Sequence, residues 1–248
     1  MKNQSFSLLV TGQSLANAGD VFYIVAVITS VYNVTNSLFY VSLVPVINML
    51  GGFLGGLLSP LLIERYRLKK ILFNSQLVKT CILLVLTLYV ASFLSRDSIE
   101  AVYIIIFSIT FLDSFANPAS SALIPQIVSA ENLLKANSLM SSVHQFIQMG
   151  GWAVGGILAA FLHSNGLMKL TFSLYVLSTF VLAFVKVKET KQSEENSENK
   201  SKMTSMFEGW RLILEDKRLR TLHLTLFFGS IASPVWVSSI LYPFITIG

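Results

Sequence analysis

Long apolar stretches separated by short polar connections run through almost the whole chain. About 20 mostly apolar residues suffice for one helix to cross a membrane, and stretches of that length recur from one end of the chain to the other. We expect membrane-spanning helices at residues 8–32, 38–62, 71–95, 99–125, 136–162, 166–187 and 220–246. The pattern therefore predicts an all-α polytopic membrane protein.

A polar segment follows the sixth expected span. Residues 188–202 are rich in Lys, Glu, Ser and Asn and contain no aromatic residue, a composition typical of a flexible linker. Residues 206–214 alternate apolar and polar positions, which predicts an amphipathic helix on the inner membrane surface, with Lys217, Arg218 and Arg220 near the headgroups. We divide the chain into a six-span bundle at 1–187, a cytoplasmic linker with this helix at 188–219 and a seventh span at 220–248.

Positive charge is distributed unevenly between the connections. The connections after the second, fourth and sixth spans are richer in basic residues than the others. They carry Arg65, Arg67, Lys69 and Lys70, then Lys135, and then Lys186, Lys188 and Lys191. Because lysine and arginine near span ends stay on the cytoplasmic side, we predict a multi-pass protein of the cell (cytoplasmic) membrane with a cytoplasmic N-terminus. A seven-helix receptor, the alternative for seven spans, would place the N-terminus outside.

Composition excludes several classes of protein. Of the 248 residues, 53% are hydrophobic and 12% are charged, whereas soluble domains carry about 25% charged residues. The net charge of +5 comes from residues at span ends and in the linker, so it follows the topology and predicts no nucleic-acid partner. Because the single cysteine, Cys81, lies in an apolar run and the histidines are scattered, we expect no enzyme, no metal site and no cofactor.

Glycines and aspartates recur at matching places in two parts of the chain. Gly51-Gly52 and Gly55-Gly56 in the second span are repeated in the fifth as Gly150-Gly151 and Gly155-Gly156. Asp20 in the first span has a counterpart in Asp113 of the fourth. Recurrence three spans later reverses the direction through the membrane, which is typical of the 3+3 inverted repeat of secondary transporters. Small residues at this spacing also let helices pack closely in any membrane protein.

Polar side chains inside the spans are the candidates for chemistry. Gln13, Asn17 and Asp20 follow helical spacing and share one face of the first span. Asp113 and Asn117 form a similar stripe in the fourth, together with Thr110 and either Ser120 or Ser121. A charge near the bilayer centre costs a few kcal/mol, so both stripes should face a cavity or the bundle interior. Asp20 or Asp113 would bind a coupling proton or a cationic substrate; alternatively, each is a protonated or hydrogen-bonded acid that links helices.

Two other groups of polar residues receive structural interpretations. Lys79 lies about two turns into the third span and is expected to extend back to the membrane interface. Hydrogen bonding between helices is expected from a polar stripe in the fifth span, beside which His144 is a candidate proton site. The stripe comprises Ser138, Ser141, Ser142, Gln145 and Gln148.

Three motifs resemble those of a known family. The loop after the second span resembles the signature G-x-x-x-D-R-x-G-R-[RK] of the major facilitator superfamily, with Glu64-Arg65 as the acid–arginine pair and Lys69-Lys70 as the basic end. Within that family, residues 115–139 look like the end of span four and the start of span five of multidrug and macrolide-efflux permeases. Gly151 to Gly156 is similar to the antiporter motif G-P-x-x-G-G, with Trp152 in place of proline.

The resemblance implies a fold and an activity. It implies a six-helix bundle, the N-terminal half of a permease with about one further span, and proton-coupled efflux of a hydrophobic or cationic small molecule by alternating access. Expected partners are the lipid bilayer, a small-molecule substrate, and a complementary half or a second copy. The conformational latch would comprise Glu64, Arg65, Lys69 and Lys70, and the close helix contacts Gly51, Gly52, Gly55, Gly56, Gly151, Gly155 and Gly156.

Family members of usual length have twelve spans in two halves, so we expect a truncated, split or fragmentary product. A non-transporting remnant or a membrane partner subunit is the alternative.

Overall fold

The computed structural model describes residues 4–95, 98–187 and 215–236 and is entirely helical in its regular structure over these ranges. Its helices are α1 (Gln4–Thr35), α2 (Leu38–Arg65), α3 (Leu68–Ser92), α4 (Ile99–Ile127), the short 3₁₀ helix η2 (Ala130–Asn132), α5 (Leu133–Ala183) and α7 (Lys217–Trp236). Five helical segments, from α1 to α5, are long and apolar enough to cross a membrane. For the described residues, an all-helical structure with several helices able to span a membrane is therefore confirmed.

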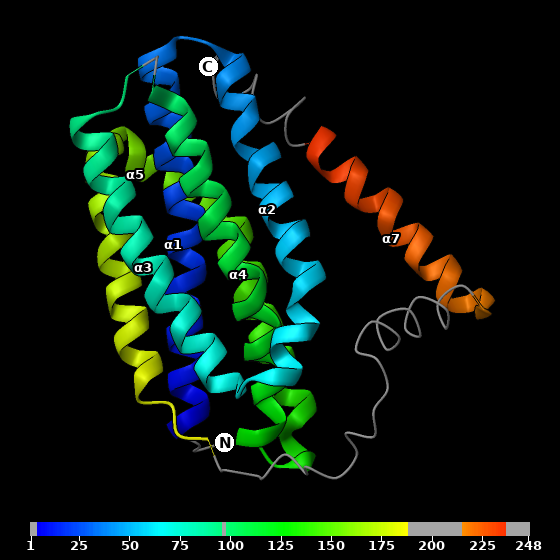
Figure 1. Cartoon of the computed structure of the whole chain (residues 1–248). Helices are drawn as coiled ribbons and strands as arrows, with labels where there is room; N and C mark the ends of the chain where they lie inside the picture. Colours follow the sequence, from blue (N-terminus) through cyan, green and yellow to red (C-terminus); the bar gives the residue numbers. More distant parts are fainter. Residues whose placement is uncertain (1–3, 96–97, 188–214, 237–248) are drawn as a thin grey trace. The chain divides into compact units, whose positions relative to one another are not determined.

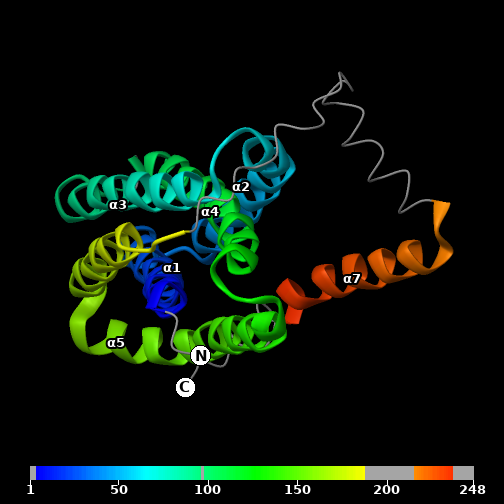
Figure 2. The same ribbon diagram turned by 90° about the horizontal axis from the view of Figure 1, so that it is seen from below.

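The helix α5 contains a break that divides it into two helical parts. At His163 the backbone has φ 56° and ψ 171°, which is not helical, and the following Ser164-Asn165-Gly166 is rich in turn-forming residues. The break lies between the spans expected at 136–162 and 166–187. Figure 2 shows α5 turning sharply, so that its second part runs back beside α1.

The chain forms two compact units, Met1–Thr190 and Lys191–Gly248. In the first unit α1 packs mainly against α5, α2 packs against α4, and α3 packs against both α4 and α5 (Figure 1). The N-terminus, the α2–α3 connection, the α4–α5 connection and the end of α5 lie at one end of this unit. The described basic residues beside these connections thus lie at the end of the unit where α1 begins.

A tightly packed apolar core closes that end of the unit. Its buried residues come from the start of α1, the start of α3, the second half of α4 and both ends of α5. They are Phe6, Leu9, Leu68, Ile71, Leu72, Phe115, Ala116, Ala119, Leu123, Ile124, Val128, Ala136, Leu182 and Val185. This core holds the helices together just beyond the polar residues described below.

Two glycines bring α2 against the backbone of α4. A Cβ added at Gly51 would lie 2.8 Å from the carbonyl oxygen of Phe107, and one at Gly55 would lie 2.6 Å from that of Phe111. Both distances are shorter than van der Waals contact, so only glycine fits here without moving the helices apart. Ser114 adds a hydrogen bond of 3.0 Å from its Oγ to the Gly52 carbonyl.

The glycines selected in α5 lie against α1 with more room. A Cβ at Gly151 would lie 3.3 Å from a methyl group of Val21, and one at Gly155 would lie 3.2 Å from a methyl group of Val25. Apart from the surrounding backbone of the same helix, no described atom lies within 4 Å of such a Cβ at Gly56 and Gly156, and at Gly52 the nearest lies at 3.7 Å. Of the glycines selected from the sequence, Gly51 and Gly55 make the closest helix contacts.

In the second unit the structure describes α7 and the residues just before it. Residues 188–214, which include the expected amphipathic helix, lie outside the described residues, as do residues 237–248 of the expected seventh span. The described helix α7 is not among those apolar enough to cross a membrane. The seventh span, the headgroup position of Lys217, Arg218 and Arg220, and the division at 187 and 219 stay predictions.

Candidate functional site

The interior of the first unit contains one ammonium group between two carboxylates. Lys79 of α3 places its Nζ 2.9 Å from Oδ1 of Asp20 on α1 and 2.6 Å from Oδ1 of Asp113 on α4. The Lys79 side chain is 0% exposed, and those of Asp20 and Asp113 are 18% and 26% exposed. We call these three residues the ion triad. The ion triad links α3 to both α1 and α4. Of these three helices, only α3 and α4 pack closely against each other.

The ion triad corrects the prediction for Lys79. Its side chain does not extend back to the membrane interface; it points into the bundle, where two carboxylates compensate for its lost hydration. The two aspartates selected from separate spans are thereby brought to one cation. Two ionised carboxylates and one ammonium together carry a formal charge of −1.

Tyr175 of α5 holds the Asp20 side of the triad. Its hydroxyl donates a short hydrogen bond to Oδ1 of Asp20, and its ring centroid lies 5.1 Å from the Lys79 Nζ, within the range of a cation–π interaction. The ring fits because α1 has Gly19 beneath it, where an added Cβ would lie 2.6 Å from the ring atom Cε1. Asp20 therefore receives donors from both α3 and α5.

Sequence reasoning did not select Tyr175 or Gly19. A signal was present, because Gly12 and Gly19 are seven residues apart and so lie on one face of α1. A Cβ added at Gly12 would lie 2.6 Å from Leu182 Cδ2, so the Leu182 side chain packs directly on this glycine. The Gly12 carbonyl accepts a 2.8 Å hydrogen bond from Ser178 Oγ. The two glycines form the groove in which the second part of α5 lies.

On the Asp113 side, residues of the predicted α4 stripe contact one another and α1. Asn117 Nδ2 donates to Oδ2 of Asp113 at 2.9 Å, and one turn earlier the Thr110 hydroxyl lies 3.4 Å from that of Tyr23. Asn117 and Asp113 are both half-buried. Asp113, the more exposed carboxylate of the triad, thus accepts a hydrogen bond from Lys79 at one oxygen and from the Asn117 amide at the other.

The stripe of α1 is buried as predicted but is less connected. Gln13 and Asn17 are 5% and 7% exposed, and no hydrogen bond joins either side chain to the ion triad in the described structure. On α3, Gln76 lies one turn before Lys79 and is 1% exposed, and its Nε2 has no acceptor among the described residues. The polar interior therefore continues from the triad along α1 and α3.

The polar stripe of α5 stands apart from the triad. Ser138, Ser141, Ser142, His144 and Gln145 are exposed in the described unit, and Gln148 is half-buried. None of them forms a described hydrogen bond to another helix, so the structure does not bring them into the candidate site.

The predicted latch residues are spread around the α2–α3 connection. Lys69 Nζ donates to the Ala183 carbonyl at 3.3 Å, which ties the start of α3 to the end of α5. The Arg65 guanidinium lies 5.7 Å from the Tyr66 ring centroid. Within the described residues no ion pair joins Glu64 to Arg65, Lys69 or Lys70. Glu64 instead lines an open pocket of about 430 Å³ with Gly56, Ser59, Pro60, Ile63 and Pro118.

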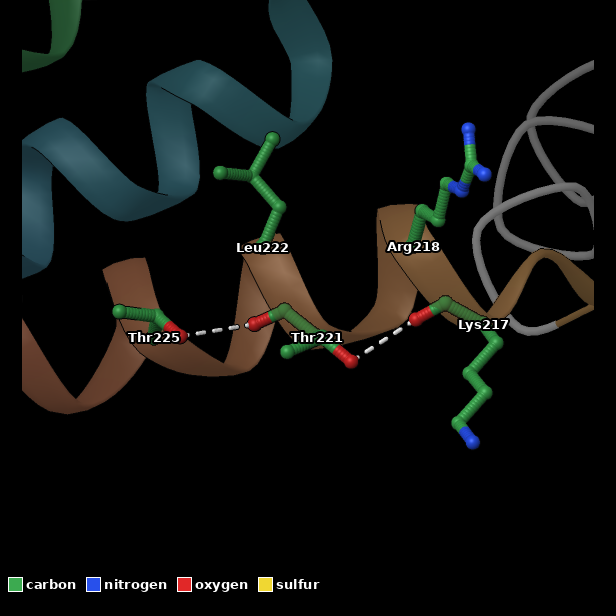
Figure 3. Close-up of a pocket in the computed structure, with 5 residues that line it drawn as sticks. All are labelled: Lys217, Arg218, Thr221, Leu222 and Thr225. Carbon is green, nitrogen blue, oxygen red and sulfur yellow. Dashed lines mark hydrogen bonds between the residues drawn. The ribbon is translucent and has the colours of Figure 1, made fainter.

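A second open pocket, of about 490 Å³, lies along α7 (Figure 3). Its lining residues are Lys217, Arg218, Thr221, Leu222 and Thr225. Both threonine hydroxyls donate to carbonyls one turn earlier on the same helix, at 2.8 Å and 2.9 Å. Their hydroxyl protons are therefore engaged within α7, and we assign no chemistry to this pocket.

Comparisons with known proteins identify the family. Residues 9–247 match the family model described as Major Facilitator Superfamily. Three proteins of Bacillus subtilis (strain 168), each described as an uncharacterized MFS-type transporter, are similar. YfmI is 32% identical over 99% of this chain and 60% of its own length, and YjbB is 22% identical over 98% and 59%. YvqJ is 29% identical over 48% of this chain and 29% of its own length.

No solved structure matches this chain. The chain spans about 60% of the length of the first two relatives. The predicted resemblance to a transporter superfamily, and the expectation that the chain is not an enzyme, are confirmed at the level of that superfamily. Because the family model covers almost every residue, this membrane protein belongs to the major facilitator superfamily.

Proposed function

We propose that this chain forms part of a secondary active transporter that exports a hydrophobic or cationic small molecule in exchange for protons. The ion triad carries the proposal, because a lysine and two aspartates lie buried between apolar membrane helices. Charged groups at that depth are costly and are found mainly on substrate or ion pathways. The formal charge of −1 gives the site a reason to accept a proton or a cationic substrate.

An inverted 3+3 repeat, part of this proposal, is supported by paired contacts. Gly51 and Gly55 of α2 lie against α4, which carries Asp113. Gly151 and Gly155 of α5 lie against α1, which carries Asp20. If the first three spans correspond to the next three, the α2–α4 contact corresponds to the α5–α1 contact, and the two aspartates face one lysine from equivalent helices. Transporters with such repeats place their sites where the repeats meet.

Alternating access requires a second bundle that moves against this one. A complementary half or a second copy is the partner that we propose, in the cell membrane and with the N-terminus in the cytoplasm. The connection between α2 and α3 would then act as the latch. Glu64 lines an open pocket, and among the described residues no ion pair joins it to Arg65, Lys69 or Lys70, which leaves its carboxylate accessible to a basic group of that partner.

Transport is tested with purified chain in liposomes, alone and together with a complementary half taken from the YfmI-type relative. We expect doxorubicin, a fluorescent hydrophobic primary amine that is protonated at neutral pH, to move only when a proton gradient is imposed, with proton flux reported by trapped pyranine. Asp113→Asn should reduce this movement at least tenfold, because it removes the more exposed carboxylate of the triad. Glu100→Gln, the same exchange at the exposed start of α4, should leave it unchanged.

Two outcomes would contradict the proposal. The first is the absence of any proton-dependent doxorubicin movement in both preparations, which would favour a non-transporting membrane subunit. The second is an equal loss in the Asp113 and Glu100 variants, since that would separate transport from the ion triad.

The proposed orientation gives a separate prediction. In a Cys81→Ala background, Ser95→Cys should react with a membrane-impermeant thiol reagent added to whole cells, whereas Lys2→Cys should react only after the cells are opened. Ser95 lies exposed in the α3–α4 connection, at the end of the first unit opposite the N-terminus. The reverse labelling pattern would place the N-terminus outside and support a receptor-like topology.

A further inference from the structure

We propose that the space between Asp20 and Asp113 is a binding site for a protonated amine, that Lys79 is its resident occupant, and that an incoming amine displaces Lys79 from Asp113 alone. The inference rests on the proposed transport function for its physiological role, since it names the substrate class of the same site. The binding step itself can be measured without transport.

The groups around the Lys79 ammonium form a recognition set for nitrogen that carries N–H bonds. Two carboxylate oxygens lie 2.9 Å and 2.6 Å from Nζ, and an aromatic ring lies 5.1 Å away. Charge-assisted hydrogen bonds of this length need a proton between nitrogen and oxygen. A quaternary ammonium has methyl groups in place of N–H donors, so its nitrogen would be kept farther from both oxygens.

The two carboxylates are not equivalent. Asp20 is the less exposed one, and its Oδ1 is shared between Lys79 and the Tyr175 hydroxyl. Gly19 fixes the Tyr175 ring, because the ring fills the volume that any side chain there would need. Asp20 is thus held by two helices and keeps Lys79 in the bundle when the other contact is lost.

Asp113 is the accessible member. Its side chain is 26% exposed, and its second oxygen is bound by Asn117, which is itself half-buried. An amine that approaches the bundle therefore reaches Asp113 and Asn117 before it reaches Asp20. When its ammonium replaces Lys79 on Asp113, both carboxylates keep a cation, so neither charge is left unpaired in the interior.

The contact of Lys79 with Asp113 weakens the binding of an external amine. An external amine binds only to the fraction of molecules in which Lys79 has left Asp113, so its apparent affinity is lowered by that fraction. Removing Lys79 should strengthen amine binding at Asp113, whereas the same removal should create no comparable site at the enclosed Asp20. Two double variants test this difference while keeping the formal charge of −1 at the site.

The experiment measures equilibrium binding of radiolabelled benzylamine to the full chain in lipid nanodiscs. We expect saturable binding to the natural chain, displaced by unlabelled benzylamine but not by benzyltrimethylammonium, which has no N–H donor. Asp20→Asn with Lys79→Met leaves only the Asp113 carboxylate and should bind at least about tenfold more tightly. Lys79→Met with Asp113→Asn, the matched control, leaves only Asp20 and should lose saturable binding.

Three results would overturn the inference: equal displacement by the two competitors, equal affinities in the two double variants, or no saturable binding to the natural chain. The competitor comparison needs no variant and decides the matter even if neither double variant folds. Failure of doxorubicin transport with benzylamine binding intact would reject the transport proposal alone, and doxorubicin transport without benzylamine binding would reject this inference alone.

Discussion

Gly55→Ala is expected to destabilise the bundle by about 1–3 kcal/mol or more, the usual range for overpacking a close contact. The added Cβ would lie 2.6 Å from the Phe111 carbonyl oxygen and 2.7 Å from Ser114 Cβ. Backbone atoms have no rotamer by which to move away, so α2 and α4 must separate. Thermal unfolding of the purified chain in detergent, followed by helical circular dichroism, measures the loss.

The neighbouring glycine provides a control of opposite sign. At Gly56 no described atom lies within 4 Å of an added Cβ, so Gly56→Ala should be neutral or stabilise the chain by up to about 1 kcal/mol through helix propensity. Gly155→Ala should lie between these two, because its neighbours are side-chain atoms of Val25 and Phe22 that can adjust. Equal effects at Gly55 and Gly56 would contradict the close α2–α4 contact.

Lys79→Met is expected to cost about 3–5 kcal/mol, because it leaves two carboxylates facing one another in the bundle without a counter-ion. For a chain of this size, such a loss lowers the unfolding temperature by roughly 10 °C. Methionine has a similar length and no charge, so it fills the same space along α3 and isolates the electrostatic contribution.

Neutralising the aspartates should restore the stability lost in Lys79→Met step by step. Asp20→Asn added to Lys79→Met should recover part of it, and a triple variant that also carries Asp113→Asn should approach the natural chain, since fully neutral replacements of buried ion pairs are often tolerated. A single Lys79→Met variant as stable as the natural chain, at neutral pH, would show that the ammonium does not pair with both aspartates.

The spans were predictable because each depends only on the local apolar pattern. The expected span at 8–32 lies within α1, and the break between the spans expected at 136–162 and 166–187 occurs at His163. Asp20 and Asp113 were selected for the same reason, since a carboxylate is conspicuous in an apolar stretch. Sequence spacing alone did not show that both approach one cation.

Lys79 shows where local reasoning fails. Its distance from the cytoplasmic end of α3 allows a long side chain either to return to the interface or to enter the bundle. The choice depends on what α1 and α4 place opposite it, and that is a property of helix packing. Tyr175 was missed for a related reason: an aromatic residue in a span usually packs, and its role appears only once Gly19 admits its ring.

The latch residues illustrate a third case. Glu64, Arg65, Lys69 and Lys70 were predicted to form a conformational latch. In the structure Lys69 donates to a carbonyl at the end of α5, and Glu64 borders an open pocket. Short loops hold charges close in sequence, but helix ends point them in different directions. Their role as a latch stays a prediction that concerns a partner bundle.

The only cysteine of the chain is exposed on α3, two residues after the lysine of the ion triad. A fluorophore attached to Cys81 would therefore sit at the level of Lys79 but on the outer side of the helix. Quenching by lipids brominated at defined carbons along the acyl chain then measures the depth of the buried charges in a bilayer, with no substitution anywhere in the protein.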